Sequence, residues 1–208
     1  MRPLTSDLLL RAYAMGIFPM ARSRHDPRLY WIDPDQRGIL PLDAFHVPRS
    51  LRKVLRREAF EIHCDTAFEA VMEGCSEATR DRPDTWINDE IVALFVELHH
   101  LGMAHSVETW MDGELVGGLY GLSLGGAFFG ESMFSRVTDA SKVAMVHLVA
   151  RLKTGGYTLL DTQFVTEHLA RFGAVEIARA DYLRRLNQAT EIPAVFPRGD
   201  VPWERAFG

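Results

Sequence analysis

A glycine-rich apolar run over residues 117–136 constrains the fold of this chain most strongly. Six glycines fall within the first fourteen residues of GGLYGLSLGGAFFGESMFSR, and one acid, Glu131, interrupts its apolar end. Glycine weakens a strand unless a ligand or another backbone must approach closely. We therefore expect tightly packed strands here, with Glu131 placed at a functional site.

A second polar pair lies on a predicted buried strand over residues 157–164. Asp161 and Gln163 are two residues apart, so strand alternation predicts that both side chains point to one face. An acid beside an amide at a strand end suits proton handling next to a bound carbonyl or amine. Asp161 and Gln163 are thus candidate catalytic residues, and the alternative is a strand-end acid that caps the next helix.

Hydrophobic periodicity and turn signals predict an α/β fold of the α+β type, with a mixed sheet and helices on both faces. The Asp112-Gly113 dipeptide predicts a hairpin turn. The N-terminal segment is too short to hold its own core, so we expect a small domain over residues 1–45 and a catalytic domain over residues 46–208. The expected helices cover residues 5–15, 67–75, 86–100, 139–155 and 166–172, and the expected strands cover residues 37–42, 104–110, 115–122, 127–134 and 157–164.

The composition is that of an ordinary globular protein, because 47% of the 208 residues are hydrophobic and 25% are charged. Glycines and charges interrupt every apolar stretch before the ~20 residues of a membrane span. The first residues lack a signal-peptide pattern. Cys64 and Cys75 lack metal-site spacing. We expect a reduced cytoplasmic protein without a metal, and a monomer because no feature indicates an obligate partner.

Charge is unevenly distributed along the chain. Residues 1–57 carry a net charge of +6, and the rest carry -11. A predicted helix with Ser50 as its cap concentrates the surplus. Its basic face is either solvated surface or a patch that meets phosphates. The candidate phosphate-binding residues are Arg49, Arg52, Lys53, Arg56 and Arg57.

Seven short motifs, in order along nearly the whole chain, resemble the leucyl/phenylalanyl-tRNA–protein transferase family. They are Tyr13-Ala14-Met15-Gly16-Ile17-Phe18-Pro19, Trp31-Ile32-Asp33-Pro34, Thr85-Trp86-Ile87, His105-Ser106-Val107-Glu108, Gly117-Gly118-Leu119-Tyr120-Gly121, Gly130-Glu131-Ser132-Met133-Phe134-Ser135 and Asp161-Thr162-Gln163.

The resemblance implies an aminoacyltransferase that moves Leu or Phe from tRNA to the α-amino group of proteins beginning with Lys or Arg. Transfer of Met is a further candidate. The product is a destabilising N-terminus that the proteolytic machinery of the cytoplasm reads. The resemblance also implies an acetyltransferase-like C-terminal domain beside a small N-terminal one. No cofactor is expected, because aminolysis of an activated ester needs neither metal nor nucleotide.

The resemblance places Asp161 and Gln163 at the family's proposed catalytic positions. A free α-amino group has a pKa of ~8, so the enzyme must divert a proton and stabilise an oxyanion. We expect Asp161 to polarise the Gln163 amide, which orients the amine. Glu131 would contact the aminoacyl-adenosine or the amine, with Ser132 as a second donor, unless Arg136 simply neutralises it.

Selectivity for Leu and Phe requires an apolar pocket shaped at the Cβ carbon. Candidate pocket residues are Leu119, Phe128 and Phe134, although most apolar residues of this run must be ordinary core. The resemblance places Trp31 and Trp86 beside the 3′-terminal adenosine, and Tyr13 is a further candidate. Aromatic stacking on a base contributes ~1–3 kcal/mol.

Two other functions remain open from the residues. An acyl-CoA-dependent N-acyltransferase would use a glycine-rich turn to hold pyrophosphate, but residues 135–142 contain no glycine and include Asp139. A non-catalytic tRNA-binding module would use the basic helix alone and would leave Glu131, Asp161 and Gln163 without a purpose.

Overall fold

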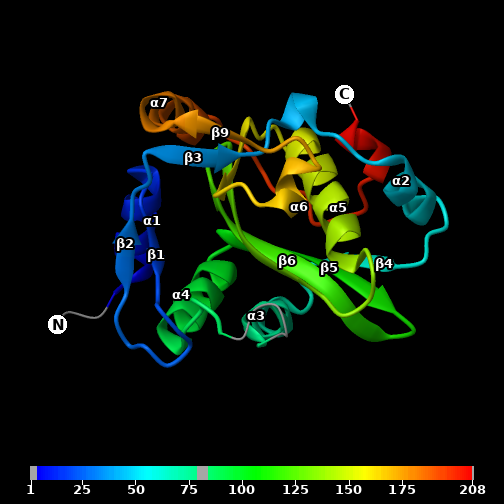
Figure 1. The fold of residues 1–208 in the computed structure, drawn as a ribbon, viewed down its shortest axis with the longest axis horizontal. Helices are drawn as coiled ribbons and strands as arrows, with labels where there is room; N and C mark the ends of the chain where they lie inside the picture. The colour runs from blue at the N-terminus through cyan, green and yellow to red at the C-terminus, as the bar shows by residue number, and fades with distance from the viewer. Residues whose placement is uncertain (1–3, 79–83, 208) are drawn as a thin grey trace.

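A computed structural model describes residues 4–78 and 84–207, and these residues form a seven-stranded mixed sheet and a two-stranded one (Figure 1). β7 and β8 pair in parallel, and the other pairs are antiparallel. The predicted α+β class with a mixed sheet is thereby confirmed. In spatial order the large sheet contains β4 (Glu61–Cys64), β5 (Ala104–Met111), β6 (Glu114–Leu124), β7 (Ala127–Ser135), β8 (Leu159–Gln163), β3 (Gln36–Ile39) and β9 (Val175–Ala178).

Helices cover both faces of this sheet, and each face has its own apolar core (Figure 1). On one face lie α1 (Ser6–Ala14), α3 (Phe68–Ser76), α4 (Asp89–His100) and α7 (Arg179–Thr190). The other face carries α5 (Ala140–Thr154), α2 (Arg49–Leu55), α6 (Glu167–Ala170) and the short helix η2 (Trp203–Ala206). Within the described ranges, none of the helices combines the length and apolar character needed to cross a bilayer.

The N-terminal segment contributes to both sheets. β1 (Phe18–Met20) and β2 (Tyr30–Ile32) form the two-stranded sheet. β3 lies within the first 45 residues, yet it is inserted between β8 and β9 of the large sheet. The boundary near residue 45 stays a prediction, but the segment before it is physically part of the main sheet.

The glycines of β6 allow close approach of other protein atoms. A Cβ atom on Gly121 would lie 2.2 Å from the carbonyl oxygen of Phe129, and one on Gly117 would lie 2.6 Å from Cβ of Ala140. Glycine is required at both positions because a side chain would separate β6 from β7 or from α5. At these two positions the glycines serve packing, not contact with a ligand.

α2 and α5 begin without a side-chain capping hydrogen bond. α2 begins at Arg49 with Pro48 as its N-cap, so the predicted cap, Ser50, lies inside the helix. Asp139 is the N-cap residue of α5, at the predicted helix start, but its side chain makes no capping hydrogen bond. Its carboxylate accepts a hydrogen bond from Lys142 at 2.6 Å instead.

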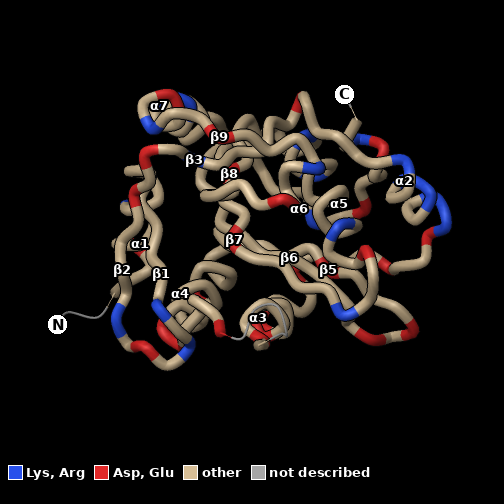
Figure 2. Tube along the Cα trace, viewed as in Figure 1, with Lys and Arg blue, Asp and Glu red and all other residues tan. Residues whose placement is uncertain are grey.

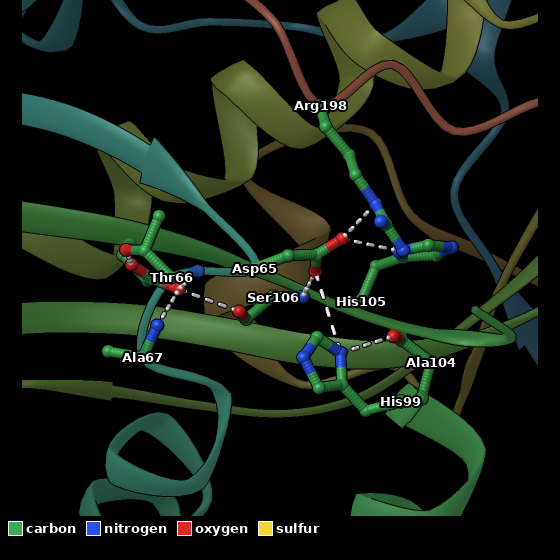
Figure 3. A network of polar contacts seen from close by, with 9 residues as sticks. Asp65, Thr66, Ala67, His99, Ala104, His105, Ser106 and Arg198 are labelled. Atoms are coloured by element: carbon green, nitrogen blue, oxygen red, sulfur yellow. Dashed lines mark hydrogen bonds and ion pairs between the residues drawn. The ribbon is translucent and has the colours of Figure 1, made fainter. Parts of the chain in front are cut away.

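A buried polar network fastens the C-terminal segment to β5 (Figure 3). Asp65 accepts a hydrogen bond from the backbone N–H of Ser106 at 2.9 Å, and its carboxylate lies 2.8 Å from Nδ1 of His105. Nε of Arg198 contacts the same carboxylate at 2.8 Å. Burial alone would raise the pKa of Asp65, but the hydrogen bond and charge of His105 lower it overall. The ionised form of Asp65 therefore holds the segment in place.

Candidate active site

A cavity of about 710 Å³ opens where β7 and β8 diverge. The pairing of the two strands ends at Phe129 and Asp161. Residues that follow these positions, from Gly130 on β7 and from Thr162 on β8, line the cavity. The splayed parallel strands thus expose side chains that a continuous sheet would cover. The apolar part of the lining includes Leu119, Met133, Phe134, Met145, Leu148, Leu160 and Leu169.

The cavity brings together six of the residues singled out from the sequence. They are Trp86, Leu119, Glu131, Ser132, Phe134 and Gln163. The described lining residues do not include Tyr13, Trp31, Phe128 or Asp161. The placement of these four differs from the expectation, and each has a structural reason.

Phe128 belongs to the core on the α5 face and does not reach the cavity. Its ring is fully buried and stacks on Phe196 with centroids 5.7 Å apart. It also meets the ring of Tyr157 edge-on at 6.2 Å. Phe128 lies on the part of β7 that still pairs with β8, so it has no open side on which to contact a ligand.

Trp31 points away from the cavity because of its register in the small sheet. Phe18 and Met20 line the cavity, and they pair with Ile32 and Tyr30. Trp31 pairs with Pro19, so strand alternation places it on the opposite face. Its side chain is 44% exposed there.

Asp161 is fully buried in an ion pair. Its oxygens accept hydrogen bonds from Nε of Arg37 at 3.0 and 3.1 Å and from Nη2 of Arg37 at 2.6 Å. The hydroxyl of Tyr182 donates to the same carboxylate at 2.5 Å. That Asp161 and Gln163 share one face stays a prediction. The capping alternative is wrong, because Thr166 caps α6.

A strained turn lies at Gln163, the last residue of β8. Gln163 has a φ of 57°, and the N–H of Phe164 donates to the carbonyl of Thr162 at 2.6 Å. This is the i to i+2 bond of a γ-turn, a conformation that non-glycine residues rarely adopt. The carboxylate of Asp161 accepts the N–H of Gln163 at 2.8 Å and so supports the turn. Backbone strain of this kind clusters at functional sites.

The amide of Gln163 is oriented by two backbone carbonyls. Nε2 donates to the oxygens of Gly130 at 2.8 Å and of Thr162 at 3.1 Å in the orientation that satisfies its neighbours. The other end of the amide, which is Oε1 in this orientation, lies 3.4 Å from Oε1 of Glu131. Two oxygens at this separation repel if the carboxyl group is ionised.

Glu131 is kept mostly protonated near neutral pH. Burial raises its pKa to about 8, and the negative charge of Asp161 acts in the same direction. The hydroxyl of Tyr13 donates to Oε1 at 2.8 Å and opposes this shift. Arg136 does not neutralise Glu131, because its guanidinium pairs with Glu77. Tyr13 is itself fully buried, so it positions Glu131 from within the core and offers no surface for stacking on a base.

Sequence reasoning missed Arg37 and Tyr182. Arg37 is one of several arginines in the N-terminal segment, and Tyr182 lies on a polar helix near the C-terminus. Their guanidinium and hydroxyl meet only because β3 is inserted beside β8. No local pattern in the sequence signals such a contact.

The predicted basic face is present on α2 and its end (Figure 2). The exposed members are Arg49, Lys53, Arg56 and Arg57. Arg52 is only partly exposed, because Nε donates to the carbonyl of Val47 at 3.1 Å and its guanidinium lies over the ring of Phe207. Arg52 therefore helps to hold the C-terminus as well as adding charge.

Comparisons with known proteins match this chain to one family. A family model described as "Leucyl/phenylalanyl-tRNA protein transferase" matches residues 39–187, and the model of its N-terminal domain matches residues 2–35. A leucyl/phenylalanyl-tRNA–protein transferase from Paramagnetospirillum magneticum is 72% identical over 208 residues, which is 100% of each chain. One from Rhodospirillum rubrum is 59% identical and covers 96% of this chain and 93% of its own length.

Among solved structures, L-PGS from Bacillus licheniformis matches with a TM-score of 0.40 and 16% identity, covering 76% of this chain and 53% of that one. The sequence matches are far stronger and extend over almost the full chain. They show that this chain belongs to the leucyl/phenylalanyl-tRNA protein transferase family.

Proposed function

We propose that this aminoacyltransferase moves leucine or phenylalanine from aminoacyl-tRNA to the α-amino group of proteins that begin with Lys or Arg. Methionine is a further candidate donor. The modified proteins would then enter N-degron proteolysis in the cytoplasm. The observation that carries the proposal is the juxtaposition of Gln163 and Glu131 at the edge of an apolar cavity large enough for an aminoacyl group.

In the proposed reaction the amine nitrogen attacks the ester carbonyl carbon. A C–N bond forms, the C–O bond to the ribose breaks, and the ribose hydroxyl leaves with a proton. Gln163 lines the cavity, and in this proposal its Oε1 accepts an N–H of the incoming amine. This contact holds the nitrogen lone pair toward the carbonyl carbon.

Glu131, in its ionised fraction, is the proposed acceptor of the proton that the amine loses, and it passes that proton to the departing ribose oxygen. Its pKa of about 8 is close to the ~8 of an α-amino group, so a proton passes between them with little energetic penalty. A carboxylate with an ordinary pKa would be a much weaker base at neutral pH. Ser132 lines the same cavity and is the candidate donor to the carbonyl oxygen.

Asp161 acts indirectly in this proposal, through Gln163. Its carboxylate is enclosed by Arg37 and Tyr182, so it does not touch the substrate. It accepts the N–H of Gln163 and so fixes the strained turn that presents the amide. We therefore assign Asp161 a positioning role, and Gln163 and Glu131 the catalytic roles.

The apolar lining suits a leucyl or phenylalanyl side chain. Leu119, Met133 and Leu160 lie on neighbouring strands, and Met145 and Leu148 approach from α5. Methionine side chains adapt to ligands of different shape, which fits a pocket that takes both branched and flat side chains. Such a pocket separates side chains by only ~1–3 kcal/mol per methylene.

The test is transfer of labelled leucine from leucyl-tRNA to a peptide that begins with arginine. We expect label on the peptide, and none on a matched peptide with an acetylated N-terminus. Label that remains on bound tRNA would favour a non-catalytic binding module. Tight binding of acetyl-CoA in calorimetry would instead favour an acyl-CoA-dependent enzyme.

A further inference from the structure

Two polar side chains in the lining of the cavity contain a buried atom that makes no hydrogen bond to any described residue. They are Thr162, through Oγ1, and His168, through Nε2. Thr162 is only 8% exposed. A hydroxyl that is removed from water without a partner is unfavourable, because the hydrogen bonds that it made to water are lost. Such an atom in the wall of a cavity is a candidate contact for a ligand that enters it.

Thr162 belongs to the apolar part of the lining. It follows Leu160 by two positions on β8, and both residues line the cavity, as strand alternation predicts for one face. His168 lies on α6 instead, where burial and then the positive charges of Lys142 and Arg171 lower the pKa of its ring. Of the two polar residues, Thr162 is therefore the one that an apolar side chain bound against Leu160 can contact.

Rotation about χ1 presents the hydroxyl of Thr162 to a ligand without any backbone movement. Threonine carries a methyl group and a hydroxyl on the same β-carbon, so a change between staggered rotamers exchanges their positions. The rotation breaks no hydrogen bond, because Oγ1 makes none to the described residues. Thr162 directly precedes Gln163, and consecutive Cα atoms are ~3.8 Å apart. A donor whose carbonyl carbon lies beside Gln163 therefore brings its side chain within reach of Thr162.

We propose that Thr162 is a specificity-determining residue whose hydroxyl donates a hydrogen bond to the sulfur of a methionyl donor. The inference rests on the proposed function, because it takes aminoacyl-tRNA as the donor and Gln163 as a catalytic residue. The thioether of methionine is a weak acceptor within an otherwise apolar side chain. Leucine and phenylalanine carry no acceptor, so they leave the hydroxyl unpaired. Thr162 thus raises the affinity for methionine relative to an apolar side chain of the same shape.

The experiment compares methionine with norleucine, which has a methylene group in place of the sulfur. The ligands are 3′-methionylamido-3′-deoxyadenosine and its norleucyl and leucyl counterparts, in which a stable amide replaces the ester. Their dissociation constants are measured for the wild type, Thr162→Val and Thr162→Ser. Thr109→Val is the matched control, because Oγ1 of Thr109 is likewise buried without a hydrogen-bond partner among the described residues, but Thr109 does not line this cavity.

The measured quantity is the dissociation constant of the norleucyl ligand divided by that of the methionyl ligand. We expect this ratio to fall roughly 2- to 5-fold in Thr162→Val, the lower half of the range for one hydrogen bond, because the acceptor is weak. Thr162→Ser keeps the hydroxyl and should keep the ratio, and Thr109→Val should match the wild type. The leucyl ligand should bind Thr162→Val at least as tightly as the wild type, because valine leaves no unpaired hydroxyl.

An unchanged ratio in Thr162→Val would overturn the proposal. An equal loss of affinity for all three ligands would do so as well, since it would show that the threonine only shapes the pocket. Thr162→Ala removes the same hydroxyl and replaces the valine variant if that protein does not fold. Failure of the proposed function is distinguishable, because the wild type would then transfer no leucine from leucyl-tRNA, whatever the ratio.

Discussion

Arg37 holds both carboxylate oxygens of Asp161 inside the main sheet, with its Nη2 2.6 Å from Oδ2 and its Nε within hydrogen-bonding distance of both. The side chains are 1% and 0% exposed. One partner comes from β3 in the N-terminal segment and the other from β8. The turn at Gln163 is therefore anchored across the junction of the two predicted domains.

Replacing Asp161 with alanine should affect stability and catalysis together. The substitution leaves Arg37 as a buried unpaired charge, which costs ~3–5 kcal/mol and lowers Tm by about 6–20 °C. It also frees the N–H of Gln163, so we expect leucine transfer to fall by at least ~100-fold while tRNA binding is unchanged. Arg37→Met should reproduce both defects, as measured by thermal melts and transfer assays. Full activity of Asp161→Ala at low temperature would remove this residue from the mechanism.

Gln163→Glu tests the orientation of the amide. The new carboxyl group cannot donate to the carbonyls of both Gly130 and Thr162, and it places a second acid beside Glu131. We expect single-turnover leucine transfer to fall by ~10²–10³-fold, the scale for loss of one aligned hydrogen-bonding group in a reaction centre. Gln163→Ala should fall by a similar factor with donor affinity unchanged. A Gln163→Glu variant that transfers leucine at the wild-type rate would contradict the assigned role.

Glu131→Gln should change how stability depends on pH. The carboxyl pKa is about 8 in the folded chain and 4.5 in the reference unfolded state. Between these values the folded chain keeps a proton that the unfolded chain releases, so stability decreases as pH rises from 4.5 through about 8.

The glutamine variant has no carboxyl group that titrates at this position. Its free energy of unfolding relative to that of the wild type should therefore increase from pH 5 to pH 8. Urea midpoints across that range provide the measurement. Parallel curves for the two proteins would show that Glu131 does not carry the raised pKa.

Neutralising the exposed basic residues of α2 should weaken tRNA binding without changing its sequence preference. If Arg49, Lys53 and Arg56 each bind a phosphate, every alanine substitution among them should reduce the slope of log K against log salt by about one. Arg52 is left in place because it also holds Val47 and Phe207. Arg11→Ala is the control, since α1 lies at the opposite end of the molecule (Figure 1). An unchanged slope would show that α2 is only solvated surface.

Much of this molecule could be predicted from local patterns. Apolar periodicity predicted the main helices, and the Asp112-Gly113 dipeptide predicted the turn that leads into β6. Both signals depend on neighbouring residues only. Glu131 and Gln163 were found as an acid and an amide out of place in apolar strands, and the structure brings them within 3.4 Å of each other.

The rest depends on contacts that no short pattern contains. No local pattern predicted the positive φ of Gln163, and the register of β1 with β2 turned Trp31 outward. Arg37 and Tyr182 converge on Asp161 from positions 124 and 21 residues away in the chain. Which strands continue to pair and which diverge is likewise a property of the whole sheet.

The insertion of β3 between β8 and β9 has a practical consequence for N-terminal truncation of this protein. A fragment starting at residue 46 would leave β8 and β9 each with an unpaired edge, and unpaired strand edges promote aggregation. The same deletion would strip Asp161 of its arginine and Glu131 of its tyrosine. The catalytic half is therefore expected to be recovered in active form only when the first 45 residues are supplied, either in the same polypeptide or as a separate peptide that completes the sheet.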